Sequence, residues 1–303
     1  MTPLSSTTSQ EFVDGSGTAT AVKQWHHHRD RSKALSTGLS KLDSIWMPAS
    51  GQLNLLAGRP GSFKTTLSWI IGCNLASQGK KVLWVNLEPS MAQMVESYSS
   101  RKARIPRRML GPHGSLLSLD QQAALRQSMD DFSRLPIVFH FQDTDVHSVL
   151  NRAKRVKYDA IFIDYLQLLT VKGRMSAPER IEAVAYALRD YAHSSSTFIC
   201  ALVQMNRSIE RDDESERLPK LSDLAGSAAL EASADLVSFM FDVKRRGDMA
   251  NISLYVGKNR VGPPDVFVSL NANGPLCDVH EIEDYSPYSE HERPTSKDRE
   301  RYP

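Results

Sequence analysis

The sequence predicts an α/β fold with a mainly parallel central sheet. Short apolar runs, most bounded by polar or turn residues, recur at 53–57, 82–87, 137–141, 160–163 and 198–204. Continuous apolar runs of this length are typical of strands that are covered on both faces, as in a parallel sheet. Stretches of helical character follow or separate them, at 64–78, 90–100, 119–133, 146–154 and 178–193. This alternation favours helices on both faces of the sheet.

Three later apolar segments, at 236–241, 252–256 and 266–270, have little room for helices between them. We expect them to extend the sheet by antiparallel pairing, because antiparallel strands can be joined by short turns. The predicted domain spans residues 36–280.

Both ends of the chain lack the composition of a packed core. Residues 1–35 are rich in Ser, Thr and Gly, which predicts a flexible arm with a short helix near residues 22–25. Within it, His26, His27 and His28 are interpreted as part of a solvated basic arm, because three adjacent side chains cannot all face one metal ion. Residues 281–303 carry Pro, Ser and charges of both signs, and this composition predicts a disordered tail.

Composition restricts the class of protein. With 41% hydrophobic residues, 24% charged residues and a net charge of +2, any nucleic-acid site must be local. Cys73 and Cys200 lie in apolar runs, which favours buried thiols over disulfides or a zinc site. No apolar run is long enough for a bilayer and no secretory signal opens the chain, so we expect a cytoplasmic protein.

A glycine-containing segment between an expected strand and an expected helix is the first candidate for chemistry. It comprises Gly58, Arg59, Pro60, Gly61, Ser62, Phe63, Lys64, Thr65 and Thr66. Its backbone N–H groups would form a nest for phosphate oxygens, with Lys64 reaching the β- and γ-phosphates and the Thr65 hydroxyl binding Mg²⁺. A Gly- and Pro-rich turn without a ligand is the alternative.

Phe63 departs from the usual pattern of this loop, which has glycine immediately before the lysine. A bulky residue does not readily adopt a positive φ. We therefore expect the loop to turn on Gly61 instead, with the phenyl ring directed away from the phosphates.

Polar residues follow three of the expected strands. Asp164 would hold Mg²⁺, and Glu88 would polarise the attacking water. Gln204 would hydrogen-bond the γ-phosphate. Each could be a solvated turn residue, but several strand ends that converge on one crevice favour a nucleotide site.

Two loops carry candidates for DNA contacts. Their basic residues are Lys172 and Arg174 in the first loop and Arg207, Arg211 and Lys220 in the second. Such cations suit a loop that lines a channel around nucleic acid. Because the second loop mixes charges of both signs, an ordinary solvated loop is the alternative.

Lys258 and Arg260 lie two residues apart in an extended segment, so their side chains are expected to project to the same side. Such a pair suits the phosphates of a nucleotide, and an arginine from a neighbouring subunit can raise the rate by roughly 10³–10⁵. A solvated hairpin is the alternative.

The order of these motifs resembles the ATPase domain of DnaB-type replicative helicases. The matching stretches are STGLSKLD, GRPGSFKTT, NLEPS, IDYLQLL, ALVQMNRSIE, SDLAGSAALEASADLV and GKNRVGP. The resemblance covers residues 36–270, nearly all of the predicted domain. Mitochondrial Twinkle and phage primase–helicases are similar at a greater distance.

The resemblance implies a RecA-like P-loop NTPase fold, with ATP and Mg²⁺ as ligands. The family forms hexamers that move 5′→3′ along single-stranded DNA, with the two basic loops facing the channel. The implied roles are nucleotide and Mg²⁺ binding for Lys64 and Thr65, catalytic base for Glu88, metal binding for Asp164, γ-phosphate sensing for Gln204, and action on the neighbouring subunit's nucleotide for Lys258 and Arg260.

Three features depart from the family pattern. Phe63 replaces a glycine, and residues 224–227 lack the Arg-Glu pair that usually follows Ser-Asp-Leu. Only a short arm precedes Ser36, where the family has a primase-binding helical domain. We therefore expect a minimal form, of phage or mobile-element type, or one that recruits a separate primase or helicase loader.

The leading hypothesis is an ATP-driven, ring-forming helicase motor on single-stranded or forked DNA. A RadA- or KaiC-like ATPase that loads or remodels a DNA complex without unwinding stays open. So does a low-turnover P-loop protein that binds DNA or a replisome partner. Only Phe63 favours the last, and the intact Lys64, Glu88 and Asp164 argue against it.

Overall fold

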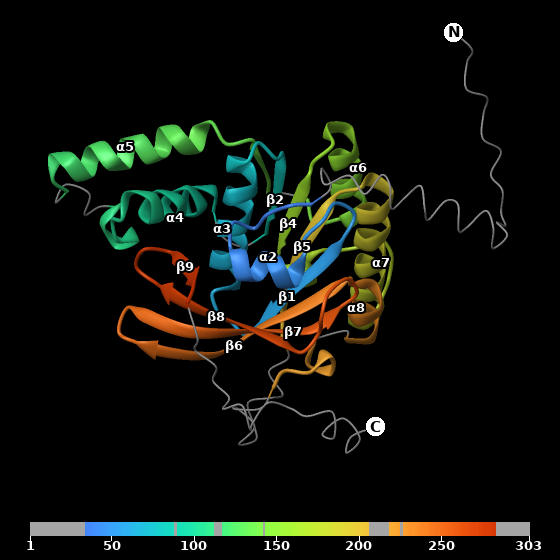
Figure 1. Cartoon of the computed structure of the whole chain (residues 1–303). Coiled ribbons are helices and arrows are strands. Elements are labelled where there is room, and N and C mark those ends of the chain that lie inside the picture. Colours follow the sequence, from blue (N-terminus) through green and yellow to red (C-terminus); the bar gives the residue numbers. More distant parts are fainter. Residues whose placement is uncertain are drawn as a thin grey trace, which may run out of the picture. The chain divides into compact units, whose positions relative to one another are not determined.

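The apolar runs form one mixed sheet in the computed structural model, which describes residues 34–87, 90–111, 117–141, 143–205, 218–224 and 227–282. Its nine described strands have the order β3-β2-β4-β5-β1-β6-β7-β8-β9 (Figure 1). Parallel pairing joins β1 (Leu53–Gly58), β2 (Val82–Asn86), β3 (Ile137–His140), β4 (Ala160–Asp164), β5 (Phe198–Gln204) and β6 (Leu236–Arg246). Antiparallel pairing adds β7 (Met249–Asn259), β8 (Val266–Asn273) and β9 (Asp278–Glu281).

The pairing of β6 corrects one expectation. All three C-terminal segments were predicted to pair antiparallel, but β6 lies parallel to β1, with Asn54 opposite Leu236. A parallel return needs a crossover of a dozen or more residues. The segment between Gln204 and Leu236 is long enough, and part of it forms α8 (Ser227–Ser233), which the sequence reading missed.

Helices cover both faces of the sheet, as predicted (Figure 1). Their bounds are α2 (Ser40–Trp46), α3 (Lys64–Ser77), α4 (Met91–Ala103), α5 (Leu119–Ser133), α6 (Val146–Val156) and α7 (Ala177–Ser195). Short 3-10 turns add η2 (Arg107–Met109), η4 (Leu166–Leu168) and η7 (Leu221–Asp223). The first group, α2 to α5, lies on one face, while α6, α7 and α8 lie on the other (Figure 1).

Side-chain caps fix where several helices begin. Ser90, Ser118 and Ser176 each accept a hydrogen bond from the backbone N–H three residues on, and the side chain of that third residue bonds back to the cap. This capping box satisfies two N–H groups that a helix end otherwise leaves without partners. Pro178 in the first turn of α7 costs no backbone hydrogen bond there.

The strands divide their side chains between two cores by alternation. In β1, Leu53, Leu55 and Ala57 face the core under α6 and α7, while Leu56 faces the core under α3. All four are fully buried. Burial on both faces explains why this strand is apolar in the sequence apart from Asn54, which is itself buried.

Aromatic packing anchors the α3 side. The rings of Trp69 and Trp84 meet edge to face at 5.0 Å, and Trp84 stacks on Phe162 at 5.2 Å. Cys73 and Cys200 are buried as predicted, and burial raises the pKa of each thiol to about 12.

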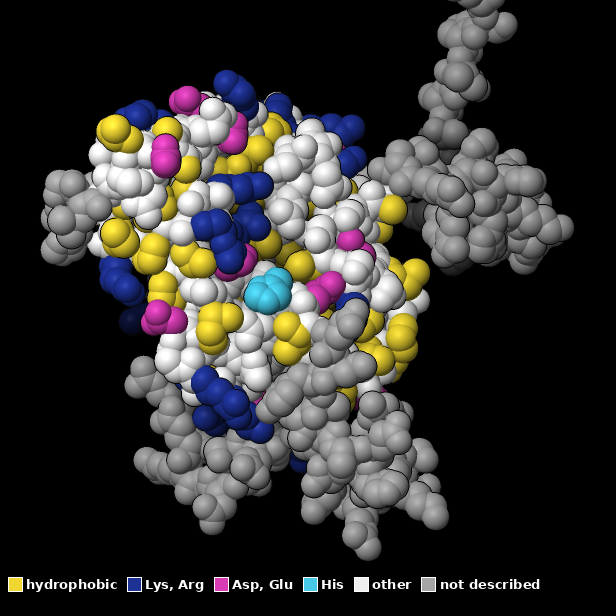
Figure 2. Space-filling model, turned by 60° about the vertical axis from the view of Figure 1, so that its left-hand side comes forward, with side chains coloured by type: hydrophobic (Ala, Val, Ile, Leu, Met, Phe, Trp, Pro, Cys, Tyr) yellow, Lys and Arg dark blue, Asp and Glu magenta, His cyan; other side chains and the backbone are white. Residues whose placement is uncertain are grey.

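Charge on the described surface is local. Figure 2 shows Lys and Arg side chains in separate groups, with acidic and apolar side chains between them. This distribution on the face drawn fits the net charge of +2. Within the described ranges, no helix is long and apolar enough to cross a lipid bilayer.

Candidate active site

The segment predicted to bind phosphate, called the phosphate loop below, connects the end of β1 to the start of α3, as predicted. Gly58 ends the strand between Gln204 of β5 and Met240 of β6. A Cβ atom at Gly58 would lie 2.6 Å from Ser62 Oγ and 2.8 Å from the Met240 carbonyl oxygen. Only glycine therefore fits where the loop folds back against the strand.

Phe63 contradicts the expectation drawn from its bulk. It adopts the left-handed conformation itself, with φ 66° and ψ 19°, and Gly61 also has a positive φ of 75°. Both residues therefore have a positive φ, and the turn at Gly61 does not spare Phe63 the left-handed conformation. A left-handed non-glycine residue costs roughly 1–2 kcal/mol. Contacts of the ring must offset that cost, and they are described below.

The Lys64 ammonium lies over the loop. Its Nζ donates a hydrogen bond to the Arg59 carbonyl oxygen at 2.8 Å and lies 3.5 Å from Ser62 Oγ. Thr65 and Thr66 follow in the first turn of α3, where free backbone N–H groups favour an anion. A hollow of about 290 Å³ opens here, lined by Gly61, Ser62, Phe63, Lys64, Thr65, Thr66, Arg245 and Gly274.

A second hollow adjoins the first at Thr65 and Thr66. It has a volume of about 220 Å³ and is also lined by Trp69, Gln93, Met94, Ser97, Arg107 and Cys277. A ligand whose phosphates occupied the loop would find this additional space beside the first turn of α3. The two hollows together suit a ligand with an anionic end and a larger organic part.

Asp164 lies at the same edge of the sheet as the loop. It ends β4 opposite Asn86 of β2, and its carbonyl oxygen accepts a hydrogen bond from the Leu87 N–H at 3.0 Å. Its side chain is buried, with 3% exposure. A carboxylate at this edge and a hydroxyl at Thr65 are oxygen donors of the kind that Mg²⁺ prefers, so the donor chemistry fits this ion. Glu88, the predicted base, lies outside the described residues.

Gln204 is linked to the turn that follows Asp164. The Gln167 side chain donates to the Gln204 carbonyl oxygen at 2.8 Å and accepts from the Gln204 N–H at 3.2 Å. Gln167 belongs to η4, so these two bonds tie the end of β5 to the segment after β4. The sequence reading missed Gln167, although its position in IDYLQLL placed it just beyond the predicted metal ligand.

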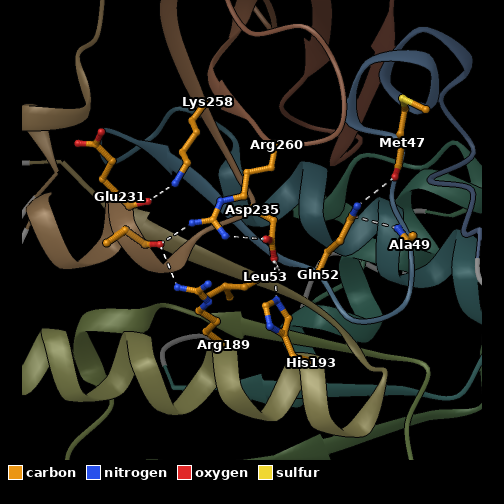
Figure 3. Close-up of polar contacts among 11 residues, drawn as sticks. Met47, Ala49, Gln52, Leu53, Arg189, His193, Glu231, Asp235, Lys258 and Arg260 are labelled. Atoms are coloured by element: carbon orange, nitrogen blue, oxygen red, sulfur yellow. Dashed lines mark hydrogen bonds and ion pairs between the residues drawn. The ribbon is translucent and has the colours of Figure 1, made fainter. Parts of the chain in front are cut away.

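Lys258 and Arg260 project to the same side, as predicted, and meet the C-terminal end of α8 (Figure 3). Lys258 Nζ donates to the Glu231 carbonyl oxygen, and Arg260 Nη2 donates to the Ala232 carbonyl oxygen at 2.8 Å. Cations here are favourable because a helix leaves its last carbonyl groups without intrahelical partners. Burial lowers the pKa of Lys258 below its usual value, and the charge of Arg260 lowers it further.

Asp235 organises the rest of this cluster (Figure 3). Its carboxylate lies 3.5 Å from Arg260 Nη1 and 3.5 Å from His193 Nε2, and it accepts a hydrogen bond from the Leu53 N–H at 2.9 Å. Arg189 of α7 donates to the same Ala232 oxygen that Arg260 contacts, at 3.3 Å. Arg189, His193 and Asp235 were not predicted, because the first two lie on α7 and Asp235 lies between α8 and β6, too far away for one sequence window to contain all three.

The cluster lies level with the start of β1, whereas the phosphate loop follows the end of β1. The two are therefore at opposite edges of the sheet, that is, at opposite ends of its strands. Asn54, near the start of β1, is level with Leu236, which in turn is level with Asn259. Gly58 lies four residues farther along β1, a rise of about 13 Å. Lys258 and Arg260 therefore lie far from the loop of their own chain.

One predicted basic loop borders a large hollow. Lys172 lies beside α6 in a hollow of about 600 Å³, together with Asp145, His147, Ser148, Asn151, Arg152, Arg155 and Val171. Arg174 is exposed two residues farther on. In the second loop, Lys220 is exposed just before η7, whereas Arg207 and Arg211 lie outside the described residues. Arg152 and Arg155 extend the predicted basic set and were missed because α6 precedes the loop in sequence.

Comparisons with known proteins point to one family. The family model described as DnaB-like helicase C terminal domain matches residues 34–275. A probable plasmid replicative DNA helicase of Chlamydia muridarum is 30% identical over 236 residues, covering 75% of this chain and 51% of that protein. The replicative DNA helicase DnaB of Rickettsia prowazekii is 27% identical, covering 83% of this chain and 57% of that protein.

Solved structures show the same fold. One solved ATPase domain superposes with a TM-score of 0.78 at 20% identity, covering 89% of this chain and all of that domain. A DnaB-like replicative helicase studied with primase also gives a TM-score of 0.78, at 19% identity, covering 90% of this chain and 68% of that one. The RecA-like fold prediction is confirmed.

The chain spans about half the length of the curated relatives that it matches. The family match itself covers most of the chain, from the segment before α2 to the turn after β8. The resemblance read from the motifs is thus confirmed, and the chain belongs to the DnaB-like helicase C-terminal domain family.

Proposed function

We propose that this chain is the ATP-driven motor of a ring-forming replicative helicase that moves on single-stranded DNA and unwinds forked DNA. One observation carries the proposal. The phosphate loop and the Lys258–Arg260 pair lie at opposite edges of one sheet, so a complete site would need two subunits. A closed ring supplies such repeated head-to-tail interfaces, and a hexamer is the ring that the family resemblance implies.

In the proposed reaction, ATP phosphates occupy the loop from Gly58 to Thr66. Lys64 would bind the β- and γ-phosphates, while Thr65 and Asp164 would hold Mg²⁺, which neutralises charge on the transferred phosphoryl group. Glu88 would orient the attacking water. Loss of the γ-phosphate would change the contacts of Gln204. Gln167 would transmit this change to the segment after β4, because two hydrogen bonds join Gln167 to Gln204.

For DNA, we propose that the hollow around Lys172 binds the phosphate backbone. Arg152 and Arg155 border it from α6, and Lys172 borders it from the loop before α7. Among the described residues, only Arg152 of these three has an acidic partner, Asp143 at 3.8 Å. The other proposed contacts are Arg174, Arg207, Arg211 and Lys220. Because a structural relative was studied with primase, a primase or loader is a proposed partner. The work would take place in the cytoplasm, with the DNA.

A strand-displacement assay on forked DNA tests the function. We expect Mg²⁺-dependent ATP hydrolysis that single-stranded DNA stimulates, displacement of the annealed strand, and a ring-sized mass with nucleotide. Hydrolysis without strand displacement would contradict the helicase function and favour a RadA- or KaiC-like remodelling ATPase. Absence of hydrolysis at any DNA concentration would leave only the low-turnover binding protein.

Replacing Arg155 and Lys172 together by alanine is expected to weaken single-stranded DNA binding and to flatten its salt dependence. Each lost phosphate contact should lower the log–log slope by roughly 0.7. The matched control is Lys154→Ala, an exposed cation on the same helix that does not border the hollow. Equal slopes for the control and the double variant, measured by fluorescence anisotropy at several salt concentrations, would remove this hollow from the DNA path.

A further inference from the structure

Phe63 and Arg245 form a contact that unites two distant parts of the chain. Arg245 lies near the end of β6, in the hairpin that β6 forms with β7. The Arg245 guanidinium lies 4.9 Å from the centre of the Phe63 ring. Its Nη2 also donates a hydrogen bond to the Gly61 carbonyl oxygen at 2.8 Å.

These contacts fix the guanidinium beside the phosphate loop. A cation over an aromatic face is attractive, and a planar guanidinium can stack there while its edge donates hydrogen bonds. The Phe63 side chain lies at the position that normally holds glycine, so the usual loop offers no such face. The left-handed conformation of Phe63 places its ring under Arg245.

The charge of Arg245 is uncompensated within the described part of the chain. It has no ion pair there, whereas the adjacent Lys244 lies 3.4 Å from Asp242. Arg245 borders the hollow of about 290 Å³ whose other walls include Lys64 and Thr65. The hydrogen bond to Gly61 uses one N–H group of the guanidinium, so its other N–H groups can donate to an anion.

We propose that Arg245 binds the diphosphate portion of the nucleotide in the same chain, and that Phe63 is the positioning residue that holds it there. This inference rests on the proposed function, because it assumes that the loop binds a nucleotide. The substitution of glycine by phenylalanine is then not a defect of the loop. It supplies the platform for a second cation beside Lys64, separate from the Lys258–Arg260 pair at the opposite edge.

The test is the affinity of the full chain for a fluorescent ADP analogue with Mg²⁺, without DNA. A charge-assisted hydrogen bond predicts that Arg245→Ala raises the Kd roughly tenfold or more. Arg245→Lys should give an intermediate value, because lysine keeps the charge but loses the planar stack. The matched control is Arg246→Ala, which removes the neighbouring exposed cation on the opposite face of the strand and should change Kd by less than about twofold.

Phe63→Leu, which keeps bulk but removes the aromatic face, tests the positioning role. In this background Arg245→Ala should have a smaller effect than in the natural chain, because residues that act as a pair are not additive. Additive effects would overturn the role of Phe63. Thermal melting of each variant shows whether the protein is folded.

The outcomes separate this inference from the proposed function. If the natural chain binds ADP, Lys64→Ala abolishes that binding and Arg245→Ala binds as tightly as Arg246→Ala, Arg245 is only a structural tether and this inference fails alone. If the natural chain binds no ADP, both fail.

Discussion

Replacing Lys64 by alanine is expected to abolish DNA-stimulated ATP hydrolysis, lowering kcat by roughly 10³-fold or more. The ammonium already lies over the loop, 2.8 Å from the Arg59 carbonyl oxygen. We expect it to exchange this carbonyl for phosphate oxygens when ATP binds. Without it, the charge that would develop on the γ-phosphoryl group loses the cation that the loop itself supplies.

The matched control for Lys64 is Lys81→Ala. Lys81 is exposed beside the start of β2, at the opposite sheet edge from the phosphate loop, and its backbone N–H bonds to Asp159 independently of its side chain. A steady-state ATPase assay with saturating single-stranded DNA should show near-normal turnover for this variant. Comparable turnover in the Lys64→Ala protein would mean that the loop is not the hydrolytic site.

The central strands could be predicted because each is buried on both faces. β4 is entirely buried and apolar from Ala160 to Ile163, so the apolar run matches the strand apart from Asp164 at its end. The hairpin of β6 and β7 extends far beyond its predicted limits, 236–241 and 252–256, because its outer residues are polar and partly exposed. Their pairing around Gly247, which has a φ of 58°, is set by the turn and not by apolar alternation.

The short helices could not be predicted for a different reason. α2 and α8 have seven residues each, too few to show a helical period. A contact from the far end of the chain supports α2: the Glu281 carboxylate accepts hydrogen bonds from the N–H groups of Lys41 and Leu42. Such an interaction joins residues that no local window contains.

Phe63 at the candidate site is a second case in which a contact distant in sequence determines the local structure. Local preference argued against a positive φ at a bulky residue, and the structure has φ 66° there. Arg245 packs on the ring and bonds the neighbouring Gly61, so a tertiary contact overrides the local preference. By contrast, Asp164 and Gln204 could be placed from sequence because each directly ends a buried strand of the same parallel sheet.

Replacing Arg260 by alanine is expected to lower kcat by roughly 10³–10⁵ while leaving ATP affinity nearly unchanged. Arg260 cannot reach the phosphate loop of its own chain, which lies at the opposite sheet edge, so it would act on a neighbouring subunit. In the single chain it is held by Ala232 and Asp235. Engaging a partner's nucleotide would require it to leave these groups.

The Arg189→Ala variant tests whether Arg260 acts directly on a nucleotide or only supports α8. Arg189 donates to the same Ala232 oxygen, so its loss also weakens the hold on the helix, but it lies on α7 and outside the Lys258–Arg260 pair. We expect this variant to keep most of its activity. A loss as large as that of Arg260→Ala would show that the cluster acts by supporting α8.

Mixing inactive subunits tests the sharing of sites directly. Arg260→Ala chains keep Lys64, and Lys64→Ala chains keep Arg260. If the groups act between subunits, random mixing in equal amounts restores about a quarter of the interfaces, because only there does an intact loop face an intact arginine. ATPase activity should therefore return on mixing. If both groups acted within one chain, every site would still lack one of them, and a mixture that assembles normally would stay inactive.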